Sequence, residues 1–254
     1  MKLLTLARDL QRRRARERQR LFVAEGVRAV EELLRSGFEV HGALVSPTLA
    51  ASPRGCALRA ALDASGAPVL EVDGQDFATA ASTESPQGVL VLARIPERSL
   101  EDLALPPRIR LLVLDGIQDP GNVGTLLRTA AAFGVTATLA MPGTVDLWNG
   151  KVVRSAMGAL FHHFVMSCTW AELDEFLAAH EVSLWGADVA GEPLDEFRTP
   201  FPPALALAVG NEGAGLSGEA TARAVRRVKI RTGPDVESLN VAVAAGILLH
   251  HFRS

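Results

Sequence analysis

The chain has 254 residues, of which 48% are hydrophobic and 22% charged, and its formal net charge at pH 7 is −3. This composition indicates a packed globular protein, excludes a disordered chain or a polycation, and gives enough length for one large domain or two ordinary ones. Charged residues occur too early for a signal peptide, and no apolar run is long enough to span a membrane, so we expect a cytoplasmic protein.

The cysteines and histidines indicate no metal site. Cys56 and Cys168 are the only cysteines, and they form no CxxC pattern, which excludes both a zinc site of that type and a disulfide framework. Two pairs of histidines are adjacent, at 162–163 and 250–251. Neighbours on a helix point to different faces, and no carboxylate or cysteine follows at ligand spacing, so we expect no bound metal.

Residues 1–95 predict a small α/β domain. The pattern indicates helices over 3–20, 25–36 and 54–64, and strands over 21–24, 40–45, 69–72 and 87–94. Residues 96–108 contain three prolines and little periodicity, so they are the expected linker.

A cluster of arginines lies in the first predicted helix. One acidic residue, Glu17, interrupts it and cannot neutralise six cations, and arginine matches phosphate geometry well. The cluster is therefore a candidate phosphate-binding patch for RNA, with an ordinary solvated helix face as the alternative. Its members are Arg12, Arg13, Arg14, Arg16, Arg18 and Arg20.

Residues 109–254 predict a second, larger domain. Apolar strands are expected over 110–114, 136–140, 183–187, 204–209 and 227–230, and helices over 121–133, 148–157, 171–180, 218–225 and 238–252. Continuous apolar strands that alternate with helices are typical of a mostly parallel sheet covered on both faces. The fold class is therefore α/β.

The first predicted strand of this domain leads into a loop with unusual polar residues. Asp119 and Pro120 are a helix-start signal, and the glycines that follow let a ligand approach the backbone. Asn122 stands at the helix entrance. Arg128 lies six residues further, roughly 9 Å along a helix axis, and a helical side chain leans back toward the N-terminus. The alternative is that Arg128 is an ordinary exposed arginine.

Two later segments repeat this pattern of strand, loop and helix. The second loop, GNEGAGLS at 210–217, has neither the lysine of a phosphate-binding P-loop nor the spacing of a dinucleotide fingerprint. Its Glu212 would repel phosphates and suits hydroxyls or a cationic centre. In the third segment, Ser238 can cap the last helix, which would place Asn240 in the first turn. Turn and capping roles alone remain the alternative.

Together these segments resemble the SpoU (TrmH) family of SPOUT RNA methyltransferases, which transfer a methyl group from S-adenosylmethionine to a ribose 2′-hydroxyl. Asn122 and Arg128 fit the family's first motif, NEG at 211–213 its second, and SLN at 238–240 its third. The stretch KVVRSAMGALFH at 151–162 resembles the segment between the first two motifs. The N-terminal stretches LFVAEGVRAVEELL and SPQGVLVLAR resemble the small substrate-binding domain of many members.

The resemblance implies a trefoil knot in residues 109–254 and a homodimer whose active site lies at the subunit interface. It implies that Gly210, Ile230, Leu239 and Ser238 hold S-adenosylmethionine, largely through backbone contacts. Arg128 would be the leading catalytic residue, and because a guanidinium stays protonated, we expect it to orient the substrate phosphate rather than to act as a base. Glu212 and Asn240 would position ribose or cofactor, and Asn122 would order its loop.

The function that follows is a ribose 2′-O-methyltransferase that acts on ribosomal RNA more than on transfer RNA. A ribosome-assembly or RNA-binding factor that uses the fold without catalysis is the main alternative. A redox enzyme with a dinucleotide site is a third hypothesis, which the misspaced glycines disfavour.

Overall fold

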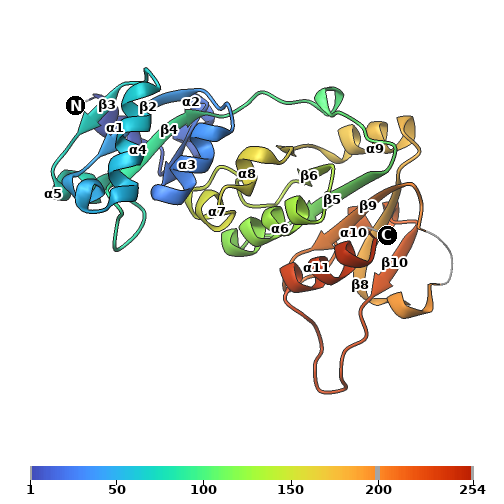
Figure 1. Cartoon of the computed structure of the whole chain (residues 1–254). Helices are drawn as coiled ribbons and strands as arrows, with labels where there is room; N and C mark the ends of the chain where they lie inside the picture. The colour runs from blue at the N-terminus through green and yellow to red at the C-terminus, as the bar shows by residue number, and fades with distance from the viewer. Residues whose placement is uncertain (1, 198–200, 253–254) are drawn as a thin grey trace. The chain divides into compact units, whose positions relative to one another are not determined.

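A computed structural model of the chain describes residues 2–197 and 201–252. The contacts divide the chain into two compact units: Met1–Glu97 with Trp148–His162, and Arg98–Leu147 with His163–Ser254. Figure 1 shows the elements of both. In the part of the chain that the structure describes, no helix combines the length and the apolar character needed to cross a bilayer.

The first unit contains a four-stranded sheet in the order β1-β4-β2-β3. Strand β4 (Val89–Arg94) runs antiparallel to β1 (Leu21–Glu25) and β2 (Val40–Val45), and β3 (Val69–Glu71) pairs parallel with β2. All four strands agree with the sequence pattern to within two residues. The accompanying helices are α1 (Lys2–Asp9), α2 (Arg13–Gln19), α3 (Val27–Arg35), α4 (Pro53–Ala64) and α5 (Gly74–Ala80).

The first expected helix, over residues 3–20, is two helices. Arg12 has extended backbone angles, so the helix is interrupted between α1 and α2. The side chain of Arg16 folds back toward this interruption. Its guanidinium donates to the carbonyls of Leu10 at 2.8 Å and Gln11 at 2.9 Å. These bonds satisfy carbonyls that a continuous helix would have paired internally. The sequence pattern was therefore wrong about one helix here.

Residues Trp148–His162, which contain α7 (Gly150–Ser155) and α8 (Ala159–His162), belong to the first unit by their contacts, although the sequence pattern places them within residues 109–254. The rings of Trp148 and Phe161 pack around Phe22, with centroids 4.7 and 6.0 Å away, and both also contact Phe38. Contacts among these four aromatic rings make a large apolar contribution to the packing of this segment.

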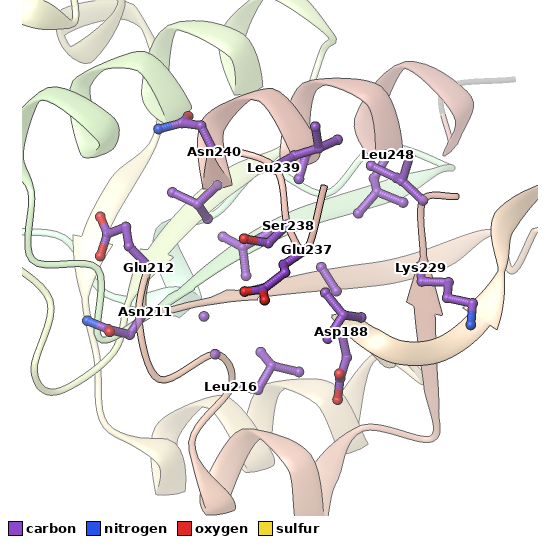
Figure 2. Close-up of a pocket in the computed structure, with 18 of the residues that line it drawn as sticks. Asp188, Asn211, Glu212, Leu216, Lys229, Glu237, Ser238, Leu239, Asn240 and Leu248 are labelled. Atoms are coloured by element: carbon purple, nitrogen blue, oxygen red, sulfur yellow. The ribbon is translucent and has the colours of Figure 1, made fainter. Parts of the chain in front are cut away.

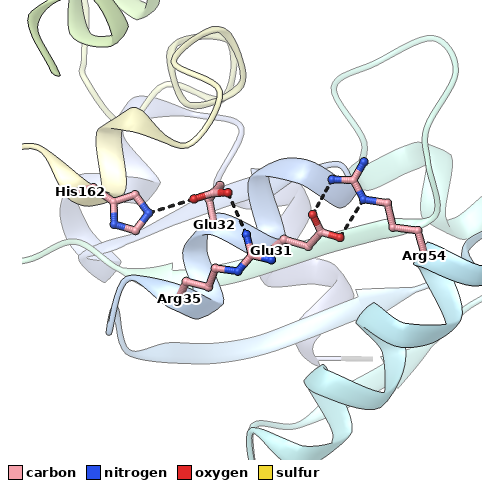
Figure 3. Close-up of polar contacts among 5 residues, drawn as sticks. All are labelled: Glu31, Glu32, Arg35, Arg54 and His162. Atoms are coloured by element: carbon pink, nitrogen blue, oxygen red, sulfur yellow. Dashed lines mark hydrogen bonds and ion pairs between the residues drawn. The ribbon is translucent and has the colours of Figure 1, made fainter. Parts of the chain in front are cut away.

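Polar contacts fix the same segment. Arg154 donates to the Ser82 hydroxyl at 2.7 Å, and that hydroxyl donates to the buried carboxylate of Glu25 at 2.6 Å. His162 lies 3.1 Å from Glu32 of α3 (Figure 3).

Glu31, beside Glu32 on α3, forms a two-pronged ion pair with Arg54 of α4, at 2.8 and 2.5 Å (Figure 3). The hydrogen bonds from Arg54 lower the pKa of the Glu31 carboxyl below its usual value. The pair therefore ties α3 to α4 within the first unit.

The second unit contains a six-stranded sheet in the order β10-β8-β9-β5-β6-β7, in which every pair of neighbours is parallel. The α/β class and the parallel sheet expected from the sequence are confirmed. The strands are β5 (Ile109–Asp115), β6 (Ala137–Ala140), β7 (Val165–Ser167), β8 (Ser183–Pro193), β9 (Ala204–Gly210) and β10 (Arg226–Lys229). The helices are α6 (Pro120–Ala132), α9 (Trp170–Ala179), α10 (Gly218–Arg223) and α11 (Val241–Phe252).

The strand order places the first two glycine-rich loops together. From β5 the chain moves outward through β6 and β7, and it then returns to the other side of β5 through β8 and β9. The last residues of β5 and β9, Asp115 and Gly210, are direct partners in the sheet. Two loops that leave adjacent parallel strands at such a reversal diverge and create a crevice, where ligands of open α/β sheets usually bind.

Candidate cofactor and active site

The loop after β5 is held by two carboxylates. Asp119 caps α6, because its Oδ1 accepts the backbone N–H of Asn122 at 2.8 Å. Asp115, 4% exposed at the end of β5, accepts the backbone N–H of Ser217 at 2.6 Å. The first loop therefore positions the end of the second directly.

The loop after β9 is folded tightly on itself. Asn211 Oδ1 accepts the backbone N–H groups of Gly213 and Ala214, each at 3.0 Å, and Asn211 Nδ2 donates to the carbonyl of Gly116 at 3.0 Å. A Cβ atom at Gly210 would lie 2.3 Å from the backbone of Gly215, so only glycine fits there.

The third segment begins its helix later than expected. Asn240 caps α11, with Oδ1 accepting the N–H groups of Ala242 at 3.0 Å and Val243 at 3.4 Å. The prediction that Ser238 caps this helix is wrong, since an asparagine two residues later performs that role. Ser238 therefore lies before the helix.

Side chains from all three segments form one hydrogen-bonded chain. Asn240 Nδ2 donates to Asn122 Oδ1 at 3.0 Å, and Asn122 Nδ2 donates to Glu212 Oε1 at 2.9 Å. The structure thus brings together three of the four residues predicted to be catalytic. The Asn122 carboxamide has one orientation, because Asn240 supplies a donor and the Glu212 carboxylate is an acceptor.

A pocket of about 830 Å³ lies beside this chain of hydrogen bonds (Figure 2). Its lining comes from the middle of β8, from the ends of β9 and β10 with the loops that follow them, and from one face of α11. It includes every residue predicted to hold the cofactor: Gly210, Ile230, Ser238 and Leu239. Glu212 and Asn240 also line it.

Arg128, the fourth residue predicted to be catalytic, is placed differently. It lies on the exposed side of α6 and does not line the pocket of its own chain. Asn122, one and a half turns earlier on the same helix, reaches the pocket rim only through Glu212 and Asn240.

The arginine cluster in the first unit is heterogeneous. Arg16 is 4% exposed and is engaged with backbone carbonyls, so it cannot present its guanidinium to RNA. Arg12 pairs with Asp9, Arg13 with Glu17 at 2.7 Å, and Arg20 with Glu97 at 3.7 Å. Arg14 and Arg18 are exposed and lie four residues apart on α2, which places them on one face.

Sequence reasoning missed four charged residues that line the pocket: Asp188, Lys229, Arg231 and Glu237. Lys229 immediately precedes Ile230, and Glu237 immediately precedes the SLN motif. For Lys229 and Glu237, a position next to a predicted cofactor-binding residue was the signal in the sequence that could have identified them. Among the residues that the structure describes, no group of three or more His, Cys, Asp or Glu side chains could hold a metal ion.

A parallel α/β sheet with a pocket lined by the loops that follow two of its strands, β9 and β10, is typical of a ligand-binding enzyme domain. The chain belongs to the SpoU rRNA methylase family, whose model matches residues 110–250. Residues 5–91 match the MRM3-like substrate binding domain. The family recognised from the sequence motifs is therefore confirmed.

Individual relatives agree with this membership. The chain is 33% identical over 247 residues to the 23S rRNA (guanosine(2553)-2'-O)-methyltransferase RlmP of Bacillus subtilis, covering 97% of this chain and 94% of the relative. It is 38% identical over 160 residues to the 23S rRNA (guanosine-2'-O-)-methyltransferase RlmB of Neisseria meningitidis, covering 62% of each. The solved structure of an AdoMet-bound rRNA methyltransferase from Sinorhizobium meliloti superposes with a TM-score of 0.87 at 27% identity, covering 99% of this chain and 94% of that one.

Proposed function

We propose that the protein transfers a methyl group from S-adenosylmethionine to a ribose 2′-hydroxyl of ribosomal RNA. The family and its S-adenosylmethionine-dependent RNA 2′-O-methylation stand on the comparisons. The observation that carries the site is the hydrogen-bonded chain Asn240–Asn122–Glu212 at the rim of the pocket. A protein that kept the fold only as a scaffold would have no need of this arrangement.

The pocket fits the cofactor in size and chemistry. About 830 Å³ is ample for a ligand of that size, and Gly210, Gly213 and Gly215 line it without side chains. Ile230 and Leu239 supply apolar walls. Three carboxylates, at Asp188, Glu212 and Glu237, and two cations, at Lys229 and Arg231, line the pocket. The excess of carboxylates favours a cationic ligand over a phosphate-rich dinucleotide. When bound, the cofactor supplies a methyl group activated by its sulfonium charge.

The protein's own residues must position the ribose. A ribose hydroxyl is a weak nucleophile, so a group that holds it in line and accepts its hydrogen bond lowers the barrier. Asn122 engages Oε1 of Glu212, and Oε2 has no partner within the described residues. We assign Oε2 of Glu212 as the acceptor for the ribose hydroxyl.

Arg128 stabilises negative charge rather than removing a proton, because a guanidinium remains protonated in proteins. A fork of N–H donors suits the phosphate beside the target ribose and the charge that develops on its oxygen. Since Arg128 does not line the pocket of its own chain, the pocket needs this residue from a second copy.

We therefore propose a homodimer in which α6 and α11 form the interface. These helices pack on each other, with Gly246 of α11 facing Thr129 of α6. One apolar face of α11 is buried within the unit, and it comprises Ala242, Ala245, Leu248, Leu249 and Phe252. Val243 and Ile247 remain 52% and 41% exposed, one turn apart on α11, and supply the apolar contact.

The first unit is proposed to capture RNA through the exposed guanidinium groups of α2, mainly Arg14 and Arg18. Ribosomal RNA is favoured over transfer RNA because the relatives from Bacillus subtilis and Neisseria meningitidis are named as 23S rRNA methyltransferases. A trefoil knot in residues 109–254, which the family resemblance implies, is part of the proposal. So is a location in the cytoplasm, because the relatives from Bacillus subtilis and Neisseria meningitidis are bacterial rRNA methyltransferases.

Methyl transfer from isotopically labelled cofactor to protein-free ribosomal RNA and to transfer RNA tests the proposal. We expect label in ribosomal RNA, at a ribose that becomes resistant to alkaline cleavage. No transfer to either RNA, with tight RNA binding, would favour the assembly-factor alternative. Stabilisation of the protein by NAD and not by S-adenosylmethionine would favour the redox alternative.

A further inference from the structure

The pocket carries charges of both signs among glycines and aliphatic side chains. Five charged residues line it: Asp188, Glu212, Lys229, Arg231 and Glu237. A charged group that already has a partner within the chain is a poor anchor for a ligand, because binding must first break that pairing. The hydrogen-bond and ion-pair partners of these five residues therefore show which of them are available to bind a ligand.

Asp188 is engaged by both of its oxygens. Oδ2 accepts from Arg227 at 2.9 Å, and Oδ1 accepts the backbone N–H of Ala190 at 2.8 Å. These contacts hold the extended end of β8 against β10. Asp188 thus shapes the pocket wall.

Two further charges are engaged elsewhere. Arg231 pairs with Asp195 at 3.2 Å and with Glu196, which turns its guanidinium toward the segment after β8. Glu212 Oε1 accepts from Asn122, and Glu212 serves the ribose in the proposed function.

Lys229 and Glu237 are the remaining pair. Within residues 2–197 and 201–252, neither side chain has a hydrogen-bond or ion-pair partner, although both line the pocket. Figure 2 shows Glu237 beside Ser238, between the Glu212–Asn240 side of the pocket and Lys229. The loop that carries Glu237 is held in its own turn, where the Thr232 hydroxyl donates to the Val236 carbonyl at 2.9 Å.

We propose that Glu237 and Lys229 hold the amino-acid end of the cofactor, with the α-ammonium group at Glu237 and the α-carboxylate at Lys229. One unengaged anion and one unengaged cation match a zwitterion. Ile230 and Leu239 line the same pocket and would supply apolar contacts to the rest of the cofactor. The assignment rests on the proposed function, because it takes the cofactor from there.

Isothermal titration with two probes tests the assignment. S-adenosylhomocysteine has the amino-acid end, and 5′-methylthioadenosine lacks it but keeps the adenosine and the sulfur. Glu237→Gln and Lys229→Gln should each weaken S-adenosylhomocysteine binding by about 10- to 100-fold, the typical effect of losing a hydrogen bond to a charged group. Binding of 5′-methylthioadenosine should stay within about twofold, as for a surface substitution without a contact.

Asp235→Asn is the matched control. It removes the same charge from the same loop, two residues from Glu237, but Asp235 does not line the pocket. It should leave both probes unchanged. Thermal unfolding of each variant verifies that the domain is folded.

The two proposals fail in different ways. If the unaltered protein binds neither probe, the proposed function is wrong. If it binds both, and Glu237→Gln weakens both equally or weakens neither, then Glu237 does not contact the ammonium group. The same comparison for Lys229→Gln overturns its contact with the carboxylate.

Discussion

Asn122 shows how much one side chain can organise at the scale of the residue. Its carboxamide accepts from Asn240 and donates to Glu212, so it joins segments that lie 118 and 90 positions away in the chain. Aspartate has the same shape but could not donate, and it would oppose the Glu212 carboxylate with a like charge. The position therefore requires an amide.

The role of Arg128 gives the first prediction. Arg128→Ala should leave S-adenosylhomocysteine affinity within a few-fold, because Arg128 does not line the pocket, while methyl transfer falls about 10²–10³-fold. Single-turnover methyl transfer and isothermal titration measure the two effects separately. Arg128→Lys keeps the charge without the planar fork and should recover only part of the rate. Full turnover by Arg128→Ala would make this residue an ordinary surface arginine.

His163 gives a prediction about pH. It is 5% exposed, its Nε2 lies 2.8 Å from the Thr138 hydroxyl, and Arg98 donates to its carbonyl at 3.1 Å. Burial, with the nearby charge of Arg98, lowers its pKa from 6.5 to about 4. The folded protein therefore keeps His163 neutral at pH values where the unfolded chain protonates it.

Below about pH 6.5 the unfolded chain gains a proton at His163 that the folded protein does not bind. The free energy of unfolding therefore falls progressively as the pH falls from about 6.5 toward about 4. Between pH 7 and pH 5 the loss should be about 2 kcal/mol of unfolding free energy. Urea unfolding at the two pH values measures it, and His163→Gln should reduce the difference. An unchanged difference in that variant would assign the pH dependence to other groups.

At the scale of the element, the sequence predicts that α11 is a helix but does not predict which of its apolar residues face the domain. Its apolar periodicity identifies a helix, and the fold confirms one. Which apolar face meets the domain and which meets solvent depends on the placement of β9 and α6, and the sequence does not contain that placement. Only the structure shows that Ala242, Leu248 and Phe252 face the domain while Val243 and Ile247 face solvent.

Dependence on a distant packing partner also explains why short strands differ from the sequence prediction. The strands β5 and β9 are long apolar runs, and the sequence identifies both closely. Strand β7 spans only Val165–Ser167 and depends on its partner β6 for its conformation, so local pattern does not reveal it. At the site, the motif residues were identifiable by resemblance. Lys229 and Glu237 needed the pocket to reveal them.

The exposed face of α11 gives the third prediction. Val243→Asp with Ile247→Asp places two charges on the proposed interface while the buried face of the helix is unaltered. The unaltered protein should scatter light with twice the mass of one chain, and the double variant with the mass of a single chain, because a buried unpaired charge is costly. Val225→Asp, at another exposed valine, is the matched control and should stay dimeric. A fully active monomer would contradict the shared active site.

At the scale of the whole molecule, the salt dependence of RNA binding gives the fourth prediction. Arg14→Gln with Arg18→Gln should weaken binding of every RNA tested and reduce the slope of log affinity against log salt by about 0.7–0.9 per lost phosphate contact. Filter binding across a salt series measures that slope. Arg59→Gln, which removes an arginine already paired with Asp63 and Glu71, is the control. An unaltered slope in the double variant would mean that these arginines do not contact phosphates and that the cluster is an ordinary solvated helix face.

The contacts of Trp148–His162 limit the modularity of this protein. The chain passes between its two units after Glu97, after Leu147 and again after His162, rather than once through a linker. A chimera made by exchanging only residues before 98 would replace Phe22 and the residues around it, so Trp148 and Phe161 would lose the side chains they pack against. Recombination that preserves function must transfer the inserted segment with the substrate domain. Residues around Phe22 and those around Phe161 are therefore expected to vary together among relatives.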